Sequence, residues 1–387
     1  MGEGERIKNS KFKTQMSKLA KNLKNMKVAI VAEELTQLGG SERVLDCFLE
    51  IFPQAPIYTI VWDDKKTSGK YRHKKIHTTF IQKMPFGVKK YKWFLPLMPW
   101  AIESFDLGDY DLVLSVTSAL AKGVKTQKPT VHVCYCNTPT RYLWFDSASY
   151  IKNAPIPNFI RPLMPIVIKL LRKWDLKASK RPDFYITNSR NVQKKIRKYY
   201  NCDSFPIFPP VDIKRFRPKD NPGQYYLIVS RIEPYKKVDL TIEVFKKLKL
   251  PLKIVGSGTR FEEYSKDASD NIEFIGRIDD DKLASYYQNA IATIFPQEED
   301  AGIVPLESMA CGRPVIAFAK GGALESIIDG KTGIFFRKQT AQSLIEAVKC
   351  FQKIQFDSKF IRTHAEKFDK EIFKKKVLDY IKGTTTI

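Results

Sequence analysis

Short apolar runs alternate with helix-like segments along most of the chain, and this alternation limits the possible folds more than any other feature. In the first half the strand-like runs are KVAIVAE, IYTIVW, DLVLSVTS, VHVCYC and DFYITNS. Apolar runs of this length, separated by helical patterns, are typical of parallel strands joined by crossover helices. We therefore expect a doubly wound α/β domain in the first half.

A proline-rich stretch interrupts this pattern in the middle of the chain. Residues 206–222 include five prolines. Such a density excludes regular structure, because proline has no backbone N–H to donate. The alternation then restarts with the runs YYLIVS, LKIVG, IEFIG, IATIFP, RPVIAF and TGIFF. The second half is thus predicted to repeat the architecture of the first.

Length and pattern together predict two domains with flanking segments. A chain of 387 residues can form two cores of ordinary size. In open α/β sheets ligands bind beyond the carboxyl ends of the strands, so a cleft between the two domains is the expected binding site. The expected segments are a basic N-terminal extension (1–25), an N-terminal Rossmann-like domain (26–205), a linker (206–222), a C-terminal Rossmann-like domain (223–368) and a C-terminal helix that packs back on the N-terminal domain (369–387).

The strongly basic composition indicates an anionic partner. Lysine and arginine number 66 against 42 acidic residues, which gives a formal net charge of +24. Nucleic acid, an acidic membrane surface and a phosphorylated small molecule all fit this charge, and so do solvated lysines without any partner. Nucleic-acid binding is the least favoured, because the sequence has no zinc-finger spacing, aromatic RNP box or basic-region heptad.

Cysteine usage and hydropathy favour a cytoplasmic location. The six cysteines are scattered along the chain, as free thiols in a reducing compartment are, rather than clustered as in a disulfide scaffold. No apolar run reaches the roughly 18 residues of a membrane-spanning helix, and the basic N-terminus lacks the apolar core of a signal peptide. Peripheral attachment to the cytoplasmic face of a membrane stays open.

The stretch QEEDAGIVPLESMACGRP gathers acids around one turn after the run IATIF. Gly302 allows close backbone approach, Pro305 suits the first helical position, and the N–H groups of residues 302–304 would form an anion site at a helix N-terminus. Glu299 and Glu307 would then accept hydrogen bonds from the hydroxyls of a sugar and a ribose on either side of a diphosphate. The alternative is that Glu307 complements a helix dipole and Glu299 is a solvated loop acid.

Two further loops carry candidate phosphate contacts. In SRIEPYKKVDL, Arg231 ends a strand and Lys236 precedes a helix whose expected N-cap is Asp239. A guanidinium fork and an ammonium together suit a diphosphate, although one lysine in so basic a chain is a weak signal. The pair Gly39-Gly40 separates the first strand from the first helix, where it would admit a ligand or form a plain tight turn.

Together these motifs resemble the GT-B glycosyltransferases, specifically the retaining family 4, over about residues 26–382. The spacing of Glu299 and Glu307 is the most specific part, and SRIEPYKKVDL and the first-strand glycine pair support it. The resemblance implies two Rossmann-like domains facing across a cleft, the C-terminal one holding a nucleotide sugar. Within the family, VHVCYCNTPTRYLWF and FPPVDIKRF are most similar to bacterial mannosyltransferases of polysaccharide and O-antigen synthesis that use GDP-mannose.

The resemblance also implies roles by position. Arg231 and Lys236 would hold the donor diphosphate and stabilise it as it leaves, and Glu299 would face the donor sugar as a catalytic residue. The other implied donor contacts are Glu307 to the ribose, Gly302, Ile303 and Val304 through their backbone, Gly39 and Gly40 from the other domain, and Arg277 and Ile278 beside the base.

One position departs from the family pattern. Many relatives carry histidine where this chain has Asn137, in the loop expected to face the sugar. An amide can donate or accept a hydrogen bond but does not titrate near neutral pH. Retaining members are thought to react on the front face of the donor, the leaving diphosphate taking the acceptor proton, so Asn137 can serve by orienting the sugar. We expect no metal and no cofactor besides the nucleotide-sugar substrate.

The segment GVKKYKWFLPLMPWAIESF (87–105) interleaves lysines with aromatic and apolar residues. This composition suits the interface of an anionic membrane, and the alternative is a core-packing helix with a solvated basic end. The family resemblance favours the membrane, because such enzymes commonly extend lipid-linked saccharides at the cytoplasmic face.

These inferences predict a retaining hexosyltransferase that moves mannose from GDP-mannose to a saccharide acceptor, itself lipid-linked, in polysaccharide or glycolipid synthesis. The alternatives are a UDP-sugar-dependent transferase, a nucleotide-sugar epimerase of similar two-domain form, and a catalytically silent protein that binds a nucleotide sugar or a polyanion.

Overall fold

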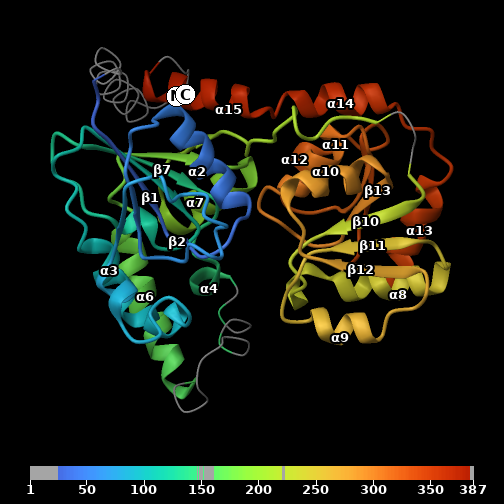
Figure 1. Ribbon diagram of the computed structural model, residues 1–387, viewed down its shortest axis with the longest axis horizontal. Helices are drawn as coiled ribbons and strands as arrows, with labels where there is room; N and C mark the ends of the chain where they lie inside the picture. The colour runs from blue at the N-terminus through green and yellow to red at the C-terminus, as the bar shows by residue number, and fades with distance from the viewer. Residues whose placement is uncertain (1–24, 146, 148–150, 152–160, 220–222, 384–387) are drawn as a thin grey trace. The chain divides into compact units, whose positions relative to one another are not determined.

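The structure is a computed structural model, and it describes residues 25–145, 147, 151, 161–219 and 223–383 (Figure 1). The chain divides into two compact units: unit 1 runs to Phe208 and resumes at Phe373, and unit 2 is Pro209–Ile372. The first division falls inside the proline-rich segment 206–222. Most of the expected N-terminal extension lies outside the described residues.

Within the described residues, unit 1 is built on a seven-stranded sheet whose neighbouring strands all run parallel. Its strand order is β5 (Ile76–Thr78), β3 (Ile57–Thr59), β1 (Val28–Ala32), β6 (Leu112–Thr117), β7 (Val131–Cys136), β8 (Phe184–Thr187) and β9 (Phe205–Pro206). A separate pair joins β2 (Glu34–Leu35) to β4 (Val61–Trp62).

Both faces of this sheet are covered, which explains why its central strands read as unbroken apolar runs. Ile30 of β1 packs into one core cluster and Val31 into another on the opposite face. The helical segments of unit 1 are α2 (Gly40–Ile51), η1 (Phe80–Lys83), η2 (Tyr91–Leu97), α3 (Met98–Glu103), η3 (Ala121–Gly123), α4 (Arg141–Trp144), η4 (Arg161–Leu163), α6 (Met164–Ala178) and α7 (Arg190–Tyr200).

The C-terminal helix α15 (Lys370–Ile381) begins in unit 2 and continues in unit 1. Phe373 stacks on Phe48 of α2 with ring centroids 6.3 Å apart, and it also meets the ring of Tyr135 on β7. This part of the helix therefore contributes to the core of unit 1.

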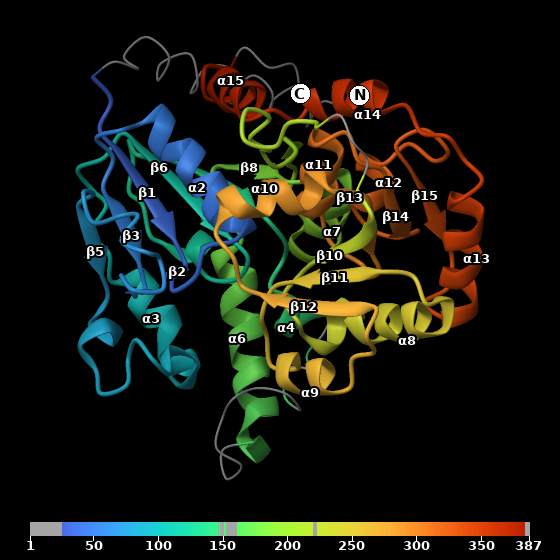
Figure 2. The same ribbon diagram turned by 45° about the vertical axis from the view of Figure 1, so that its right-hand side comes forward.

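Unit 2 has a six-stranded parallel sheet with helices on both faces (Figure 2). Tyr226 packs toward α8 and α13, and Leu227 packs on the other face toward α10 and α11. The strand order is β12 (Ile272–Gly276), β11 (Leu252–Val255), β10 (Tyr225–Val229), β13 (Ala290–Phe295), β14 (Val315–Phe318) and β15 (Gly333–Phe336). The helical segments are η5 (Pro234–Lys236), α8 (Val238–Leu248), α9 (Phe261–Lys266), α10 (Asp280–Gln288), α11 (Ile303–Ala310), α12 (Ala323–Ser326), α13 (Ala341–Phe351) and α14 (Ser358–Glu366).

Three local predictions were wrong. Asp239 lies in the first turn of α8, because the left-handed backbone of Lys237 (φ 55°) already ends η5 and starts the helix. Pro305 is the third residue of α11 rather than the first, a position whose N–H also lacks a partner within the helix. Pro206 belongs to the short strand β9, where proline is tolerated because β9 is the edge strand of its sheet.

Candidate functional site

The strand order of each sheet reverses at one point, and in such sheets ligands bind beyond the carboxyl ends of the strands there. In unit 2 this switch point lies between β10 and β13. Arg231 follows β10, Lys236 lies in η5 and Glu299 follows β13. The three residues predicted to handle the diphosphate and the sugar thus come from the two loops that flank the switch point.

Lys236 and Glu299 form an ion pair across this switch point. Their side chains are 14% and 18% exposed, so water reaches both partners. The Arg231 side chain is exposed, and its guanidinium donates a hydrogen bond to the Tyr235 hydroxyl at 2.7 Å. Two cationic groups and one carboxylate are therefore available at the same edge of the sheet.

Glycines let the neighbouring loops pack against these two loops, a feature that the sequence reasoning missed. A side chain on Gly321 or Gly322 would collide with the backbone of Glu299 or Ala301. Instead, the N–H of Gly322 donates to the carbonyl of Glu299 at 2.8 Å. A side chain on Gly258 would likewise strike the backbone of Ile232, next to Arg231. The signals for these contacts were the strings AKGG and VGSG at the ends of two predicted strands.

The turn into α11 has the geometry expected of a close backbone approach. Gly302 has φ of 81°, a conformation that side chains disfavour, and it caps the helix that begins at Ile303. Ile303 and Val304 therefore occupy the first turn, where the backbone N–H groups point away from the helix and attract anions. The backbone contacts predicted for residues 302–304 stay a prediction.

Glu307 differs from Glu299 in its surroundings. It is 2% exposed, and the Tyr287 hydroxyl of α10 donates to its carboxylate at 2.8 Å. Burial beside a hydroxyl donor fits a carboxylate that accepts hydrogen bonds, and the predicted partner, a ribose, stays a prediction. Arg277 is exposed directly after β12, and Ile278 is half-buried beside it.

Unit 1 brings Asn137 together with the glycine pair. Asn137 follows β7, and its side-chain amide donates to the Ser41 hydroxyl at 3.2 Å and to the Ser118 hydroxyl at 3.3 Å. Ser41 directly follows Gly40 in the first turn of α2. Gly39 caps that helix with extended backbone that any residue can adopt, so its left-handed freedom is not needed.

The switch point of unit 1, between β1 and β6, holds an acid that the sequence reasoning also missed. Glu33 follows β1 and accepts a hydrogen bond from the Thr117 hydroxyl at 2.7 Å. Backbone N–H groups of residues 118–121 point at the same carboxylate oxygen. The signal was the string AEEL at the end of the first predicted strand.

The adjacent acid, Glu34, has a perturbed pKa. Burial and the nearby Glu33 raise the pKa of Glu34 to about 8, against the hydrogen bond from the Tyr91 hydroxyl (3.0 Å) and the charge of Lys92. His132 inside β7 shows the opposite shift: burial lowers its pKa to about 3, and its ring bonds the Ser115 hydroxyl at 2.8 Å. Unit 1 therefore holds a protonated acid and a neutral histidine near neutral pH.

The described residues hold neither a candidate metal site nor a membrane-spanning helix. Two Asp-x-Asp patterns occur in the chain, at 109–111 and 279–281. Neither belongs to a group of three His, Cys, Asp or Glu side chains placed to hold a metal ion, and the described part of the chain has no such group. None of its helices has the length and apolar character needed to cross a membrane.

The sheet of unit 2 and its switch-point loops lie within a segment that matches a known family. Residues 212–368 match the family Glycosyl transferases group 1. Arg231, Lys236, Glu299 and Glu307 all lie inside this group 1 region, whereas Gly40 and Asn137 lie outside it.

Curated relatives share parts of the chain. This chain is 33% identical to an uncharacterized glycosyltransferase of Methanocaldococcus jannaschii over 135 residues. The aligned segment covers 33% of this chain and 38% of that protein. A D-inositol 3-phosphate glycosyltransferase of Geodermatophilus obscurus is 25% identical over 224 residues (49% and 50%). A GDP-mannose-dependent phosphatidylinositol monomannoside mannosyltransferase of Mycolicibacterium smegmatis is 32% identical over 157 residues (32% and 41%). The chain thus spans half or less of the length of these relatives.

Solved structures extend the likeness to both units. Anabaena HepE in complex with UDP matches with a TM-score of 0.67 at 15% identity, covering 91% of this chain and 98% of that one. Sucrose-phosphate synthase from Thermosynechococcus elongatus matches with a TM-score of 0.69 at 17% identity, covering 91% and 97%. These likenesses and the two Rossmann-like parallel sheets confirm the predicted GT-B fold class.

Proposed function

We propose that this protein is a retaining hexosyltransferase that moves mannose from GDP-mannose to a saccharide acceptor. The observation that carries the proposal is the Lys236–Glu299 pair beside the exposed Arg231, at the switch point of a sheet that lies within the group 1 region. The two cationic groups suit a diphosphate, and a carboxylate suits sugar hydroxyls. The mannosyl donor is supported by the similarity to a GDP-mannose-dependent relative.

The proposed reaction needs positioning and charge stabilisation from the protein. The bond between the anomeric carbon and the diphosphate breaks, the acceptor oxygen bonds that carbon on the same face, and the acceptor proton passes to a diphosphate oxygen. Arg231, Lys236 and the first turn of α11 would stabilise the charge that develops on the leaving diphosphate. We propose that these groups act without a metal ion.

A panel of nucleotide sugars tests the proposal, with the released nucleotide as the readout. GDP-mannose should give the fastest release, and NMR of the product should show retained anomeric configuration in the presence of EDTA. Faster release from UDP-glucose would assign the UDP-sugar alternative, and HepE has been solved with that ligand. Binding without release from any donor would favour the silent nucleotide-sugar binder. An inverted product, or activity that needs manganese, would contradict the mechanism.

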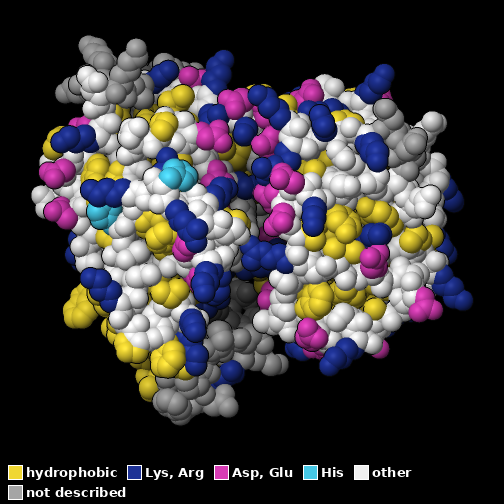
Figure 3. All heavy atoms as spheres, in the orientation of Figure 1, with side chains coloured by type: hydrophobic (Ala, Val, Ile, Leu, Met, Phe, Trp, Pro, Cys, Tyr) yellow, Lys and Arg dark blue, Asp and Glu magenta, His cyan; other side chains and the backbone are white. Residues whose placement is uncertain are grey.

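We further propose that a lipid-linked acceptor is reached from an anionic membrane surface. The segment 87–105 divides in two: Leu95 and Met98 pack in the core, whereas Trp100 is 75% exposed. Helix α6 contacts the C-terminal end of α3. The indole of Trp174 on α6 donates a hydrogen bond to the carboxylate of Glu103 on α3 at 2.6 Å. Hydrophobic and basic side chains gather where these helices lie (Figure 3). This membrane face comprises exposed Phe86, Trp93, Trp100, Leu163, Ile166 and Leu170 with exposed Lys89, Lys90, Lys92, Lys169 and Lys173.

Co-sedimentation with vesicles tests the membrane face. The protein should bind vesicles that contain phosphatidylglycerol and not vesicles of phosphatidylcholine, and added salt should weaken binding. Trp100→Ser combined with Ile166→Ser should abolish sedimentation. The matched control is Leu324→Ser, which removes an exposed apolar side chain from unit 2. An equal loss in both proteins would contradict the assignment.

A further inference from the structure

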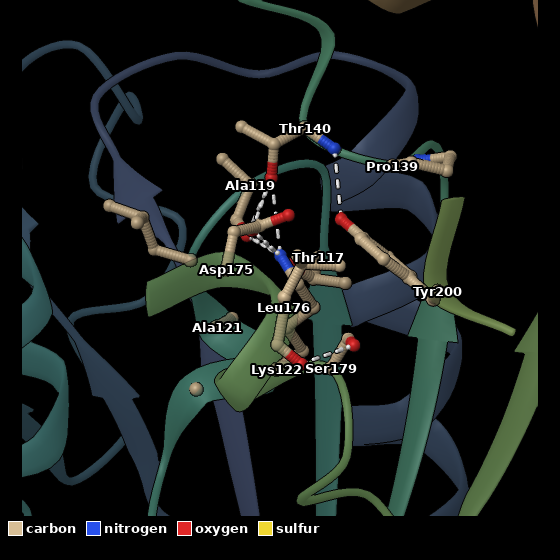
Figure 4. A network of polar contacts seen from close by, with 12 residues as sticks. Thr117, Ala119, Ala121, Lys122, Pro139, Thr140, Asp175, Leu176, Ser179 and Tyr200 are labelled. Atoms are coloured by element: carbon tan, nitrogen blue, oxygen red, sulfur yellow. Dashed lines mark hydrogen bonds and ion pairs between the residues drawn. The ribbon is translucent and has the colours of Figure 1, made fainter. Parts of the chain in front are cut away.

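Unit 1 contains a lysine and an aspartate that are both buried and paired. Lys122 of η3 is 1% exposed, Asp175 of α6 is 0% exposed, and the ammonium nitrogen lies 2.6 Å from a carboxylate oxygen (Figure 4). Moving two charges out of water is costly, and a hydrophobic pair of similar volume is often as stable. A buried pair of this kind therefore calls for a reason besides stability.

The hydrogen bonds of the pair join loops that are separate in the sequence. The Lys122 ammonium also donates to the carbonyl of Ala119, in the loop after β6, and to the Thr140 hydroxyl, in the loop after β7, at 3.2 Å. Asp175 in turn accepts from the Thr140 hydroxyl at 2.8 Å and from the Trp144 indole at 2.7 Å. The backbone N–H of Thr140 donates to the buried Tyr200 hydroxyl at 3.1 Å. All three ammonium hydrogens thus have acceptors.

These two loops are the ones that hold Asn137. Ser118, which accepts one of the Asn137 hydrogen bonds, directly precedes Ala119, and Thr140 follows Asn137 by three residues. Lys122 fixes Ala119 and Thr140 at once, so it sets the distance between the two loops whose polar groups orient the amide. An apolar replacement could fill the same volume but could not hold both loops by directed hydrogen bonds.

We propose that Lys122 and Asp175 are positioning residues that hold the loops after β6 and β7 at a fixed spacing and thereby orient Asn137 for sugar transfer. This inference rests on the proposed function. Both residues belong to unit 1, whereas the proposed diphosphate contacts belong to unit 2, so we expect the pair to act on the rate of transfer and to leave nucleotide affinity unchanged.

The test replaces the pair by apolar residues of similar volume, Lys122→Met with Asp175→Leu, which avoids leaving one charge buried. The control is Leu171→Ala, a core change one turn earlier on the same helix, which reduces packing in the cluster that includes Leu120 and Leu143 but removes no hydrogen bond to either loop. The double variant should bind GDP within about twofold of wild type. Its kcat should fall roughly 10- to 100-fold, because a misplaced catalytic group slows a reaction by about that factor. Leu171→Ala should retain kcat at a temperature where it is folded.

Hydrogen exchange separates failure of this inference from failure of the proposed function. In the double variant the amides of residues 137–144 should lose protection, whereas strand β1 should not, and Leu171→Ala should leave the 137–144 segment protected. This outcome supports the positioning role even if no nucleotide sugar is turned over. Wild-type kcat in the double variant, unchanged protection of 137–144, or equal loss in Leu171→Ala would overturn it.

Discussion

The two units differ in whether the polar groups at the switch points of their sheets already have partners within the unit or stay accessible to water. In unit 1 the Glu33 carboxylate fills the position beyond β1 and β6, where the Thr117 hydroxyl and the backbone of the next loop bond it. In unit 2 the loops beyond β10 and β13 keep Arg231 exposed and Lys236 within reach of water. Polar groups that the chain satisfies itself make a scaffold, whereas accessible charges can exchange their partner for a ligand.

The same contrast holds for two lysine–carboxylate pairs. Lys122 and Asp175 in unit 1 are sealed from water, while Lys236 and Glu299 in unit 2 are 14% and 18% exposed. Breaking a sealed pair leaves a buried charge without water or an opposite charge, but either member of an accessible pair can turn to solvent. The first pair should therefore govern folding and the second should govern binding.

The largest effect should come from removing one member of the sealed pair. Lys122→Ala should lower the free energy of unfolding by about 3–5 kcal/mol, because Asp175 stays buried without its countercharge, whereas Lys236→Ala should cost about 1 kcal/mol or less. The five tryptophans, at 62, 93, 100, 144 and 174, all lie in unit 1, so their fluorescence in urea reports that unit. Circular dichroism covers both units. Equal losses in the two variants would break the comparison.

The next effect concerns nucleotide affinity in unit 2. Arg231→Ala and Lys236→Ala should each weaken GDP binding by about 1.5–3 kcal/mol, or roughly 10- to 150-fold, because each removes a charge-assisted contact to the diphosphate. Calorimetry measures both affinities, and Lys253→Ala, a surface lysine on β11 paired with Glu273, is the matched control. Unchanged affinity in both site variants would remove the two residues from the donor site.

A feature of the fold could be predicted from the sequence when it depends on residues that are close together in the chain. Strands such as Val131–Cys136 are buried on both faces and read as unbroken apolar runs, so the alternation predicted them. Strand β5 (Ile76–Thr78) is three residues long and half-exposed at the sheet edge, and no apolar run marks it. The run IYTIVW also divides between β3 and β4, because Ile60 leaves the main sheet.

The candidate site divides in the same way. In unit 2 the site residues sit within short motifs, so the sequence patterns and the family resemblance together pointed to Arg231, Lys236 and Glu299, and the structure joins the last two. In unit 1 the sealed pair unites η3 with α6 across many intervening residues, and no local pattern links Lys122 to Asp175. Glu33 and Glu34 were readable as acids after a strand, but which of them the backbone binds depends on the turn that follows.

Asn137→Ala tests whether unit 1 contributes to transfer and not to donor binding. The variant should lower kcat roughly 10-fold while the donor KM changes less, because the amide would orient the sugar as the bond breaks. Stability should change by about 1 kcal/mol or less, since Ser41 and Ser118 are half-buried and water can replace the amide as their partner. Steady-state kinetics with GDP-mannose measure the split. A variant as fast as wild type would leave the fold assignment standing and exclude Asn137 from catalysis.

Glu34 gives unit 1 a pH dependence of known sign. Its pKa of about 8 in the folded protein exceeds its ordinary value of 4.5, so the stability it contributes is fully present below pH 4.5 and is lost as pH rises from there through about 8. Glu33 and Glu42 favour the protonated form, whereas Lys92 and the Tyr91 hydroxyl oppose it.

Glu34→Gln should therefore come close to wild type at pH 4 and exceed it in stability at pH 9, as measured by tryptophan fluorescence in urea. His132, whose pKa is lowered to about 3, destabilises both proteins equally below its ordinary value of 6.5 and cancels from the difference. A variant whose stability falls with pH as steeply as wild type would show that Glu34 is already ionised at neutral pH.

The smallest expected effect sharpens the comparison most, because it concerns the accessible pair itself. In the free protein Glu299 neutralises Lys236, so a diphosphate must compete with that carboxylate for the ammonium. Glu299→Gln removes the competing charge, and we expect GDP to bind up to about fivefold more tightly, which corresponds to roughly 1 kcal/mol for an accessible ion pair. GDP-mannose should gain less affinity than GDP, since the proposed contact of Glu299 with the sugar is weakened at the same time. The rate of transfer from GDP-mannose should fall.

Calorimetry with both ligands, repeated in the Lys236→Ala background, completes a double-mutant cycle. Without the ammonium, Glu299→Gln should leave GDP affinity unchanged. If Glu299→Gln weakens GDP binding in either background, the carboxylate supports the nucleotide rather than competing with it, and the pair in unit 2 is as fixed as the sealed pair in unit 1.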